Sequence, residues 1–320
     1  MRSKARLGVG LALAALAAPA PAQAVGDVDF SLVPVGAGRY FVFDARSDET
    51  IVGRLGVVSR ADRTQTIVLR SVDVGTAATG GLDYGLGSPA RVGTWLTLAR
   101  RRLTLGPGDV VNVPFKAHIP DSVSPGDHLG GLVAYESAKR RGRTARARGL
   151  RLAFRSRLAV AVQLRVPGPR HPRVVFRGAT IQASPSGVRI YLRLRNSGNT
   201  LIGRTRGRVV VSQAGHDGLD IPVDIDTFAP DSEIGYPLAL PGTPVQATYH
   251  LAGVLHPARG PGVRIDTDVE LTGRQATAFE RATGRSVERP AGSSPLTFIA
   301  LMLPLLIAAV FAVAYRNARR

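Results

Sequence analysis

The chain has 320 residues, 44% of them hydrophobic, a length that allows about two ordinary domains with short appendages. It contains no cysteine, which excludes disulfide bridges and cysteine-ligated zinc, and no Asn-x-Ser/Thr sequence occurs. Both absences fit an exported bacterial protein better than an exported eukaryotic one. The formal net charge of +19 points to anionic partners.

The first 24 residues have the layout of a secretory signal peptide. Arg2, Lys4 and Arg6 form a basic start, an apolar run follows over 7–18, and 22–24 is a small-x-small cleavage site. We expect cleavage after residue 24 and export of the mature chain. The alternative is an uncleaved anchor, although about a dozen apolar residues are few for a span, which needs roughly 20.

Short runs of alternating polar and apolar residues, separated by Gly, Pro, Asp and Ser, dominate residues 25–272. This pattern is typical of a β-sandwich or barrel. In a first domain over 25–166 we expect strands at 29–34, 40–44, 49–59, 66–74, 103–105, 109–119, 128–135 and 156–166. After the hinge PGPRHP, a second domain over 167–272 should have strands at 174–183, 188–196, 207–213, 220–228, 234–240, 248–255 and 264–271. The sequence therefore predicts an all-β fold of two tandem immunoglobulin-like β-sandwich domains.

The C-terminal region predicts a membrane anchor. Residues 273–295 are polar and rich in Arg, Ala, Ser and Gly, so we expect a stalk, partly helical at 275–283. Residues 296–315 carry no charge and, at ~1.5 Å per residue, would cross the ~30 Å hydrocarbon core as one helix. The basic tail 316–320 should stay in the cytoplasm. The two domains would then lie outside the cell, held at the cell membrane by a single transmembrane helix.

Several stretches of the first domain occur in the order known from one family of surface proteins. They are FSLVP at 30–34, RYFVFDARSDETIVGRLGVVSRADR at 39–63, VDVGTAATGGLDYG at 72–85, GTWLTL at 93–98, LTLGPGD at 103–109 and PDSVSPGDHLGGLVAY at 120–135. The most specific piece is PGDHLGGLVA. Residues 28–166 thereby resemble the WxL-interacting-protein peptidoglycan-binding domain of Gram-positive cell surfaces.

The resemblance implies a surface protein that holds peptidoglycan and docks other surface proteins. Family members also share the order of signal peptide, this domain, a second β-rich domain, a transmembrane helix and a basic tail. The second domain matches only in position and class, through IYLRLRNSGNT at 190–200, which resembles the Asn-x-Gly-Asn turn of surface immunoglobulin-like repeats. A role in binding host ligands is therefore not implied.

Two sets of residues in the first domain are candidates for binding. Sugars stack on exposed aromatic rings, and the glycan-binding candidates are Trp95, Tyr40, Tyr84 and Tyr135. Burial in the core is the alternative for Trp95. The long loop over 75–90, rich in small residues, either forms a binding lip or is mobile.

The second set is a run of nine cations with no acid among them: Lys139, Arg140, Arg141, Arg143, Arg146, Arg148, Arg151, Arg155 and Arg157. On an exported domain, anionic wall polymers or lipid head groups are more plausible partners than nucleic acid. We take the first six as polyanion-binding candidates. The alternative is a solvated loop and edge strand.

Residues for catalysis, cofactors or metals are scarce. The six histidines are scattered, and the glycine pairs of Gly36-Ala37-Gly38 and Gly85-Leu86-Gly87 lack the strand–helix context of a phosphate-binding loop. Asp127-His128 is either an acid–base pair or part of a turn in which the aspartate bonds its own backbone. The cluster Asp217, Asp220, Asp224 and Asp226 is either a calcium loop or the wet face of a strand.

We therefore predict a non-catalytic protein, without cofactor or metal, that binds wall polymer and scaffolds other surface proteins. The alternative is an accessory subunit of a membrane complex that contacts protein partners through strand edges.

Overall fold

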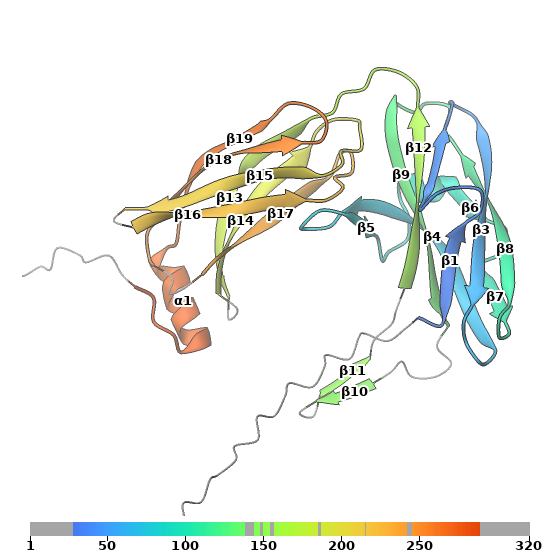
Figure 1. Cartoon of the computed structure of the whole chain (residues 1–320), viewed down its shortest axis with the longest axis horizontal. Helices are drawn as coiled ribbons and strands as arrows, with labels where there is room; N and C mark the ends of the chain where they lie inside the picture. The colour runs from blue at the N-terminus through green and yellow to red at the C-terminus, as the bar shows by residue number, and fades with distance from the viewer. Residues whose placement is uncertain are drawn as a thin grey trace, which may run out of the picture.

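The computed structural model describes residues 28–137, 144–147, 150–153, 157–184, 187–214, 216–241 and 245–288. The predicted signal peptide, membrane segment and basic tail all lie outside these residues. Within them, no helix is both long and apolar enough to cross a bilayer. The described chain forms two β domains whose strands run in different directions (Figure 1).

The first domain is a sandwich of two sheets around one core. One sheet has the order β1-β3-β8-β6 and consists of Phe30–Pro34, Thr50–Ser59, Val110–His118 and Leu96–Leu98. The other has the order β2-β12-β9-β4-β5 and consists of Phe41–Asp44, Arg157–Val166, Gly126–Glu136, Gln65–Thr76 and Leu82–Tyr84, with β7 (Arg102–Leu105) beside β4. A short 3-10 helix η1 (Val92–Trp95) precedes β6, and β10 (Thr144–Ala147) pairs with β11 (Leu150–Ala153) as a separate hairpin. Alternate residues of each strand enter the core, as the two-residue period of a pleated strand requires.

The chain crosses from one sheet to the other between β1 and β2, and this leaves two sheet edges partly open. β1 pairs with β3 only from Leu55 to Ser59, and β2 runs parallel to β12 only from Val162 to Arg165. In the described part of the chain, residues 50–53 of β3 and 157–161 of β12 therefore have a partner strand on one side only.

The second domain is also a sandwich. Its smaller sheet has the order β13-β14-β17 (Val174–Ser184, Gly187–Asn196 and Glu233–Leu240). Its larger sheet has the order β16-β15-β18-β19 (His216–Ile225, Thr205–Gln213, Thr248–Pro257 and Val263–Glu270). The prediction of an all-β chain with two β-sandwich domains is confirmed by these four sheets.

The helix expected at 275–283 is confirmed, but the expectation of a stalk outside the domain is wrong over the part that the structure describes. Helix α1 (Gly273–Thr283) begins at a capping box of Thr272 and Gln275 and ends at Gly284, whose φ is +68°. Its Phe279 side chain is buried in the core of the second domain. The helix therefore closes that sandwich. Residues 273–288 are mostly polar, so the sequence does not predict that their few apolar side chains are buried.

Candidate functional site

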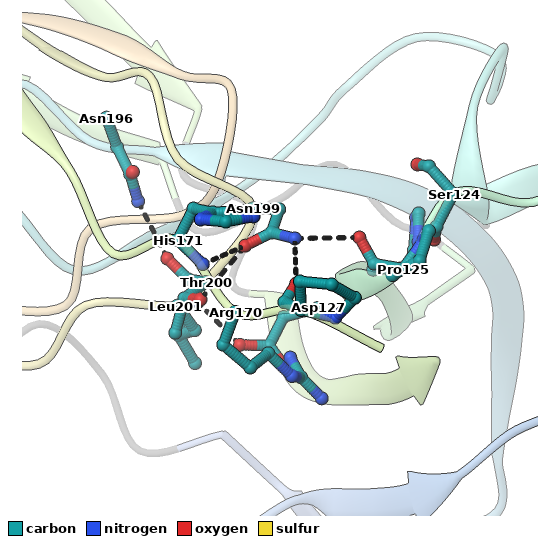
Figure 2. Close-up of polar contacts among 11 residues, drawn as sticks. Ser124, Pro125, Asp127, Arg170, His171, Asn196, Asn199, Thr200 and Leu201 are labelled. Atoms are coloured by element: carbon teal, nitrogen blue, oxygen red, sulfur yellow. Dashed lines mark hydrogen bonds and ion pairs between the residues drawn. The ribbon is translucent and has the colours of Figure 1, made fainter. Parts of the chain in front are cut away.

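The two domains meet at a polar cluster centred on Asp127 and Asn199 (Figure 2). The Asp127 side chain is only 4% exposed. Its Oδ1 accepts a hydrogen bond from Arg170 Nη1 at 2.7 Å, and its Oδ2 accepts one from the backbone N–H of Leu201 at 2.7 Å. Arg170 belongs to the connector between the domains and Leu201 to the second domain. Asp127 therefore joins three segments of the chain. One interpretation of the sequence expected this aspartate to bond the backbone of its own turn, and the structure shows it bonding Arg170 and Leu201 instead.

Asn199 completes the joint from the other side. Its Nδ2 donates to the carbonyl oxygens of Pro125 (3.0 Å) and Pro169 (2.9 Å), and its Oδ1 accepts from the N–H of His171 at 2.7 Å. The N–H of Asp127 donates to the Asn199 carbonyl at 2.8 Å. The two motif-like stretches of the sequence, PGDHLGG and NSGN, thus meet in space.

Glycine at position 126 is required by this contact. Its φ is +137°, and a Cβ there would lie 2.5 Å from the Asn199 carbonyl oxygen. Both the backbone conformation and the close approach exclude a larger residue.

A second contact between the domains comes from the end of β4 and the loop that follows it. The Thr76 hydroxyl lies 2.7 Å from the Ser232 hydroxyl and accepts from the N–H of Ala229 at 2.8 Å. The N–H of Gly81 donates to the Thr227 carbonyl at 2.8 Å. The start of the 75–90 loop, with β5, reaches toward the second domain (Figure 1) and is held there, so it is not a free lip. Two separate contacts fix the orientation of one domain against the other.

A groove with exposed hydrophobic side chains lies on the first domain at the open edge of β3. It has a volume of about 390 Å³ and is lined by residues 35–38, 40–43 and 52–54. Of nine exposed large hydrophobic side chains in the described chain, four line this groove, namely Val35, Tyr40, Val42 and Val52. A fifth, Val33, lies next to it on β1. Exposed apolar side chains gathered in one place mark interaction sites.

The floor of the groove rests on three phenylalanines. The Phe41 ring packs edge-on against Phe115 with a centroid distance of 4.9 Å, and Phe43 lies 6.4 Å from Phe115. Position 53 is glycine because the Phe115 ring lies across it, where a Cβ would collide with the ring. The groove is therefore part of a packed, rigid surface.

The structure does not bring the four predicted aromatic residues together, and no ring contact joins any two of them in the described chain. Tyr40 is exposed on the groove. Trp95 is half-buried against the core, with its ring 5.3 Å from that of His128. Tyr84 is half-buried over Gly131, and burial raises its pKa. Tyr135 lies half-buried on β9 between Val68 and Arg157.

The predicted basic surface is described only in part. Arg146 belongs to β10, whereas Lys139, Arg140, Arg141, Arg143 and Arg148 lie outside the described residues. Their role in binding polyanions stays a prediction.

Two aspartates of β16 form ion pairs with arginines. Asp220 accepts from Arg208 on β15 at 2.8 Å, and Asp224 bonds Arg204, whose guanidinium lowers the pKa of that carboxyl. In the described part of the chain, no three His, Asp or Glu side chains converge as metal ligands would. These pairs agree with the interpretation of Asp220 and Asp224 as the wet face of a strand.

No protein-family model and no curated protein sequence matches the chain. Among solved structures, it is similar to the class 5 fimbriae chaperone CfaA, with 9% identity and a TM-score of 0.34 over 74% of this chain and 98% of that one. The E. coli chaperone DraB shows 12% identity and a TM-score of 0.34 over 76% and 98%. The Pseudomonas aeruginosa CupB2 chaperone shows 12% identity and a TM-score of 0.34 over 73% and 98%. These scores are too low to transfer a function to this chain.

Proposed function

We propose that this chain is a non-catalytic surface protein, anchored in the cell membrane by its C-terminal hydrophobic segment, that holds another surface protein. The groove of the first domain is the binding site. The proposal is carried by one observation: four of the nine exposed large hydrophobic side chains of the described residues line this one groove. Its volume of about 390 Å³ lies near the lower end of the ~300–1,000 Å³ range of ligand pockets.

The chemistry of the groove favours a protein partner over a sugar. Its large exposed hydrophobic side chains are three valines and Tyr40, which is the one exposed aromatic ring among its lining residues. A glycan site would need rings to stack on, with polar groups around them. Aliphatic side chains beside an unpaired strand edge are instead the surface that peptide segments recognise.

The domain joint gives this binding site a fixed place. Because the Asp127–Asn199 cluster and the Thr76–Ser232 contact both cross the boundary, the groove keeps one orientation relative to the second domain. A scaffold that holds a partner at a set position needs this rigidity.

Affinity purification of the full-length chain from native membranes tests the proposal. Gly38 lines the groove and Gly87 lies in the loop before η1, and a Cβ at either position would meet nothing within 4 Å. We expect Gly38→Gln to lose a stoichiometric protein partner, because the new side chain obstructs the groove. The matched control Gly87→Gln should keep it. Equal recovery with both variants, or no partner with the wild type, would count against the proposal.

A second candidate function is binding of peptidoglycan or another anionic wall polymer through the first domain. The nine cations over residues 139–157 and the WxL-type resemblance support it. Replacing the six candidates Lys139, Arg140, Arg141, Arg143, Arg146 and Arg148 with glutamine should abolish retention on purified cell walls. Retention of the wild type should weaken as salt rises, because ions screen exposed charges over about 10 Å at 0.1 M. Absence of retention at moderate salt would exclude this function.

A further inference from the structure

The open stretch of β3 presents unpaired backbone groups at the groove. The N–H of Val35 donates to the carbonyl of Arg54 at 3.0 Å, so Arg54 faces the β1 side, whereas the N–H of Ser59 donates to Asp109 on the β8 side at 2.8 Å. Because successive residues of an antiparallel strand face opposite edges, Thr50 and Val52 also face the β1 side. β1 ends at Pro34, so in the described chain no strand pairs with them there. Such an edge is a template for another strand.

The side chains around this edge would be covered by an added strand. Val52 is 60% exposed, and Val42 and Tyr40 line the same groove. Every second side chain of an extended segment along 50–54 would point to the face that carries Val52. The other partly open stretch, on β12, offers less, since Val160 and Ala161 are already buried.

The charges around the groove select the chemistry of the partner. Arg54 lines the groove, Arg39 belongs to its turn, and Lys116 is the register partner of Val52 on β8. None of the three has a carboxylate within salt-bridge distance among the described residues, and no acidic residue lines the groove. A second copy of this chain would set these cations against one another, which is unfavourable.

We infer that an extended segment of the partner adds to β3 as an extra strand beside Thr50 and Val52, and that this segment alternates apolar with acidic residues. The inference rests on the proposed function and names its binding mode. Main-chain hydrogen bonds hold the segment, apolar side chains cover the valines, and carboxylates pair with Arg39, Arg54 and Lys116.

The test is a selection of random twelve-residue displayed peptides on the full-length chain in detergent. The N–H of Val52 faces the open edge, so Val52→Pro removes a hydrogen-bond donor to the added strand. The hydrogen bonds between β3 and β8 are kept, and proline is tolerated at such edge positions. We expect enriched peptides that alternate apolar and acidic residues. Val52→Pro should bind them about tenfold more weakly or worse, while Val52→Thr, which keeps the N–H, binds within a few-fold of the wild type.

Gly38→Gln provides a second variant if Val52→Pro does not fold, because it obstructs the groove and leaves the strand unchanged. Failure to enrich peptides, enrichment without this pattern, or equal binding by the obstructed variant would overturn the inference. The two proposals can also fail separately. If capture of a protein partner from membranes is lost in Gly38→Gln but kept in Val52→Pro, the proposed function stands and strand addition is refuted.

Discussion

Replacing Asp127 with alanine should weaken the coupling between the two domains and destabilise the chain by about 2–3 kcal/mol. The substitution removes a carboxylate that accepts from Arg170 and from the N–H of Leu201. It also leaves that partly buried N–H without an acceptor. The expected loss is below the ~3–5 kcal/mol of a fully buried ion pair, because the Arg170 side chain is 35% exposed and regains water.

Urea unfolding followed by two probes checks this expectation. Fluorescence of Trp95, the single tryptophan, reports on the first domain, and far-ultraviolet circular dichroism reports on both. The wild type should give coincident transitions, and Asp127→Ala should give separate ones.

The chain supplies a matched control in Asp109, which ends a second Pro-Gly-Asp sequence. Asp109 is exposed, and its Oδ2 accepts from the N–H of Gly106 at 2.7 Å within its own turn. Asp109→Ala should cost about 1 kcal/mol and keep the transitions coincident. If the two alanine variants behaved alike, the Asp127 carboxylate would not hold the domains together.

Phe115→Ala should destabilise the first domain by about 3–5 kcal/mol. Phe115 is fully buried, packs against Phe41 and Phe43, and fills the space that Gly53 leaves open. Truncating it leaves a cavity under the groove, so the groove should also lose its shape and its partner.

Phe279→Ala is the control, since Phe279 is equally buried in the second domain. It should lower stability by a similar amount and leave partner binding unchanged, measured at a temperature where both variants are folded. If Phe279→Ala abolished binding as Phe115→Ala does, the groove would not be the site.

Most strands can be predicted from the local sequence, because alternating apolar residues and flanking turn residues identify a strand that has one buried face. The expected strands at 49–59, 109–119 and 188–196 match β3, β8 and β14 closely. The sequence does not predict the strands β5, β6, β10 and β11, because each has only three or four residues and shows too little alternation.

The sites depended on contacts that no local pattern contains. Asp109 and Asp127 end the same tripeptide, yet one bonds its own turn and the other bonds a domain whose sequence begins 40 residues later. Gly53 is explained only by Phe115, which comes from another strand. The sequence singled out Tyr40 as a binding residue, but the valines around it alternate along three strands and gather only after folding.

Site-specific photo-crosslinking in intact cells shows whether the groove of the first domain holds a protein partner. A photoreactive residue at Val42, on the groove, should give one discrete protein adduct. The same residue at Val210, an equally exposed valine on β15 of the second domain, should not. Absence of an adduct from Val42, or the same adducts from both positions, would mean that the groove does not hold a partner.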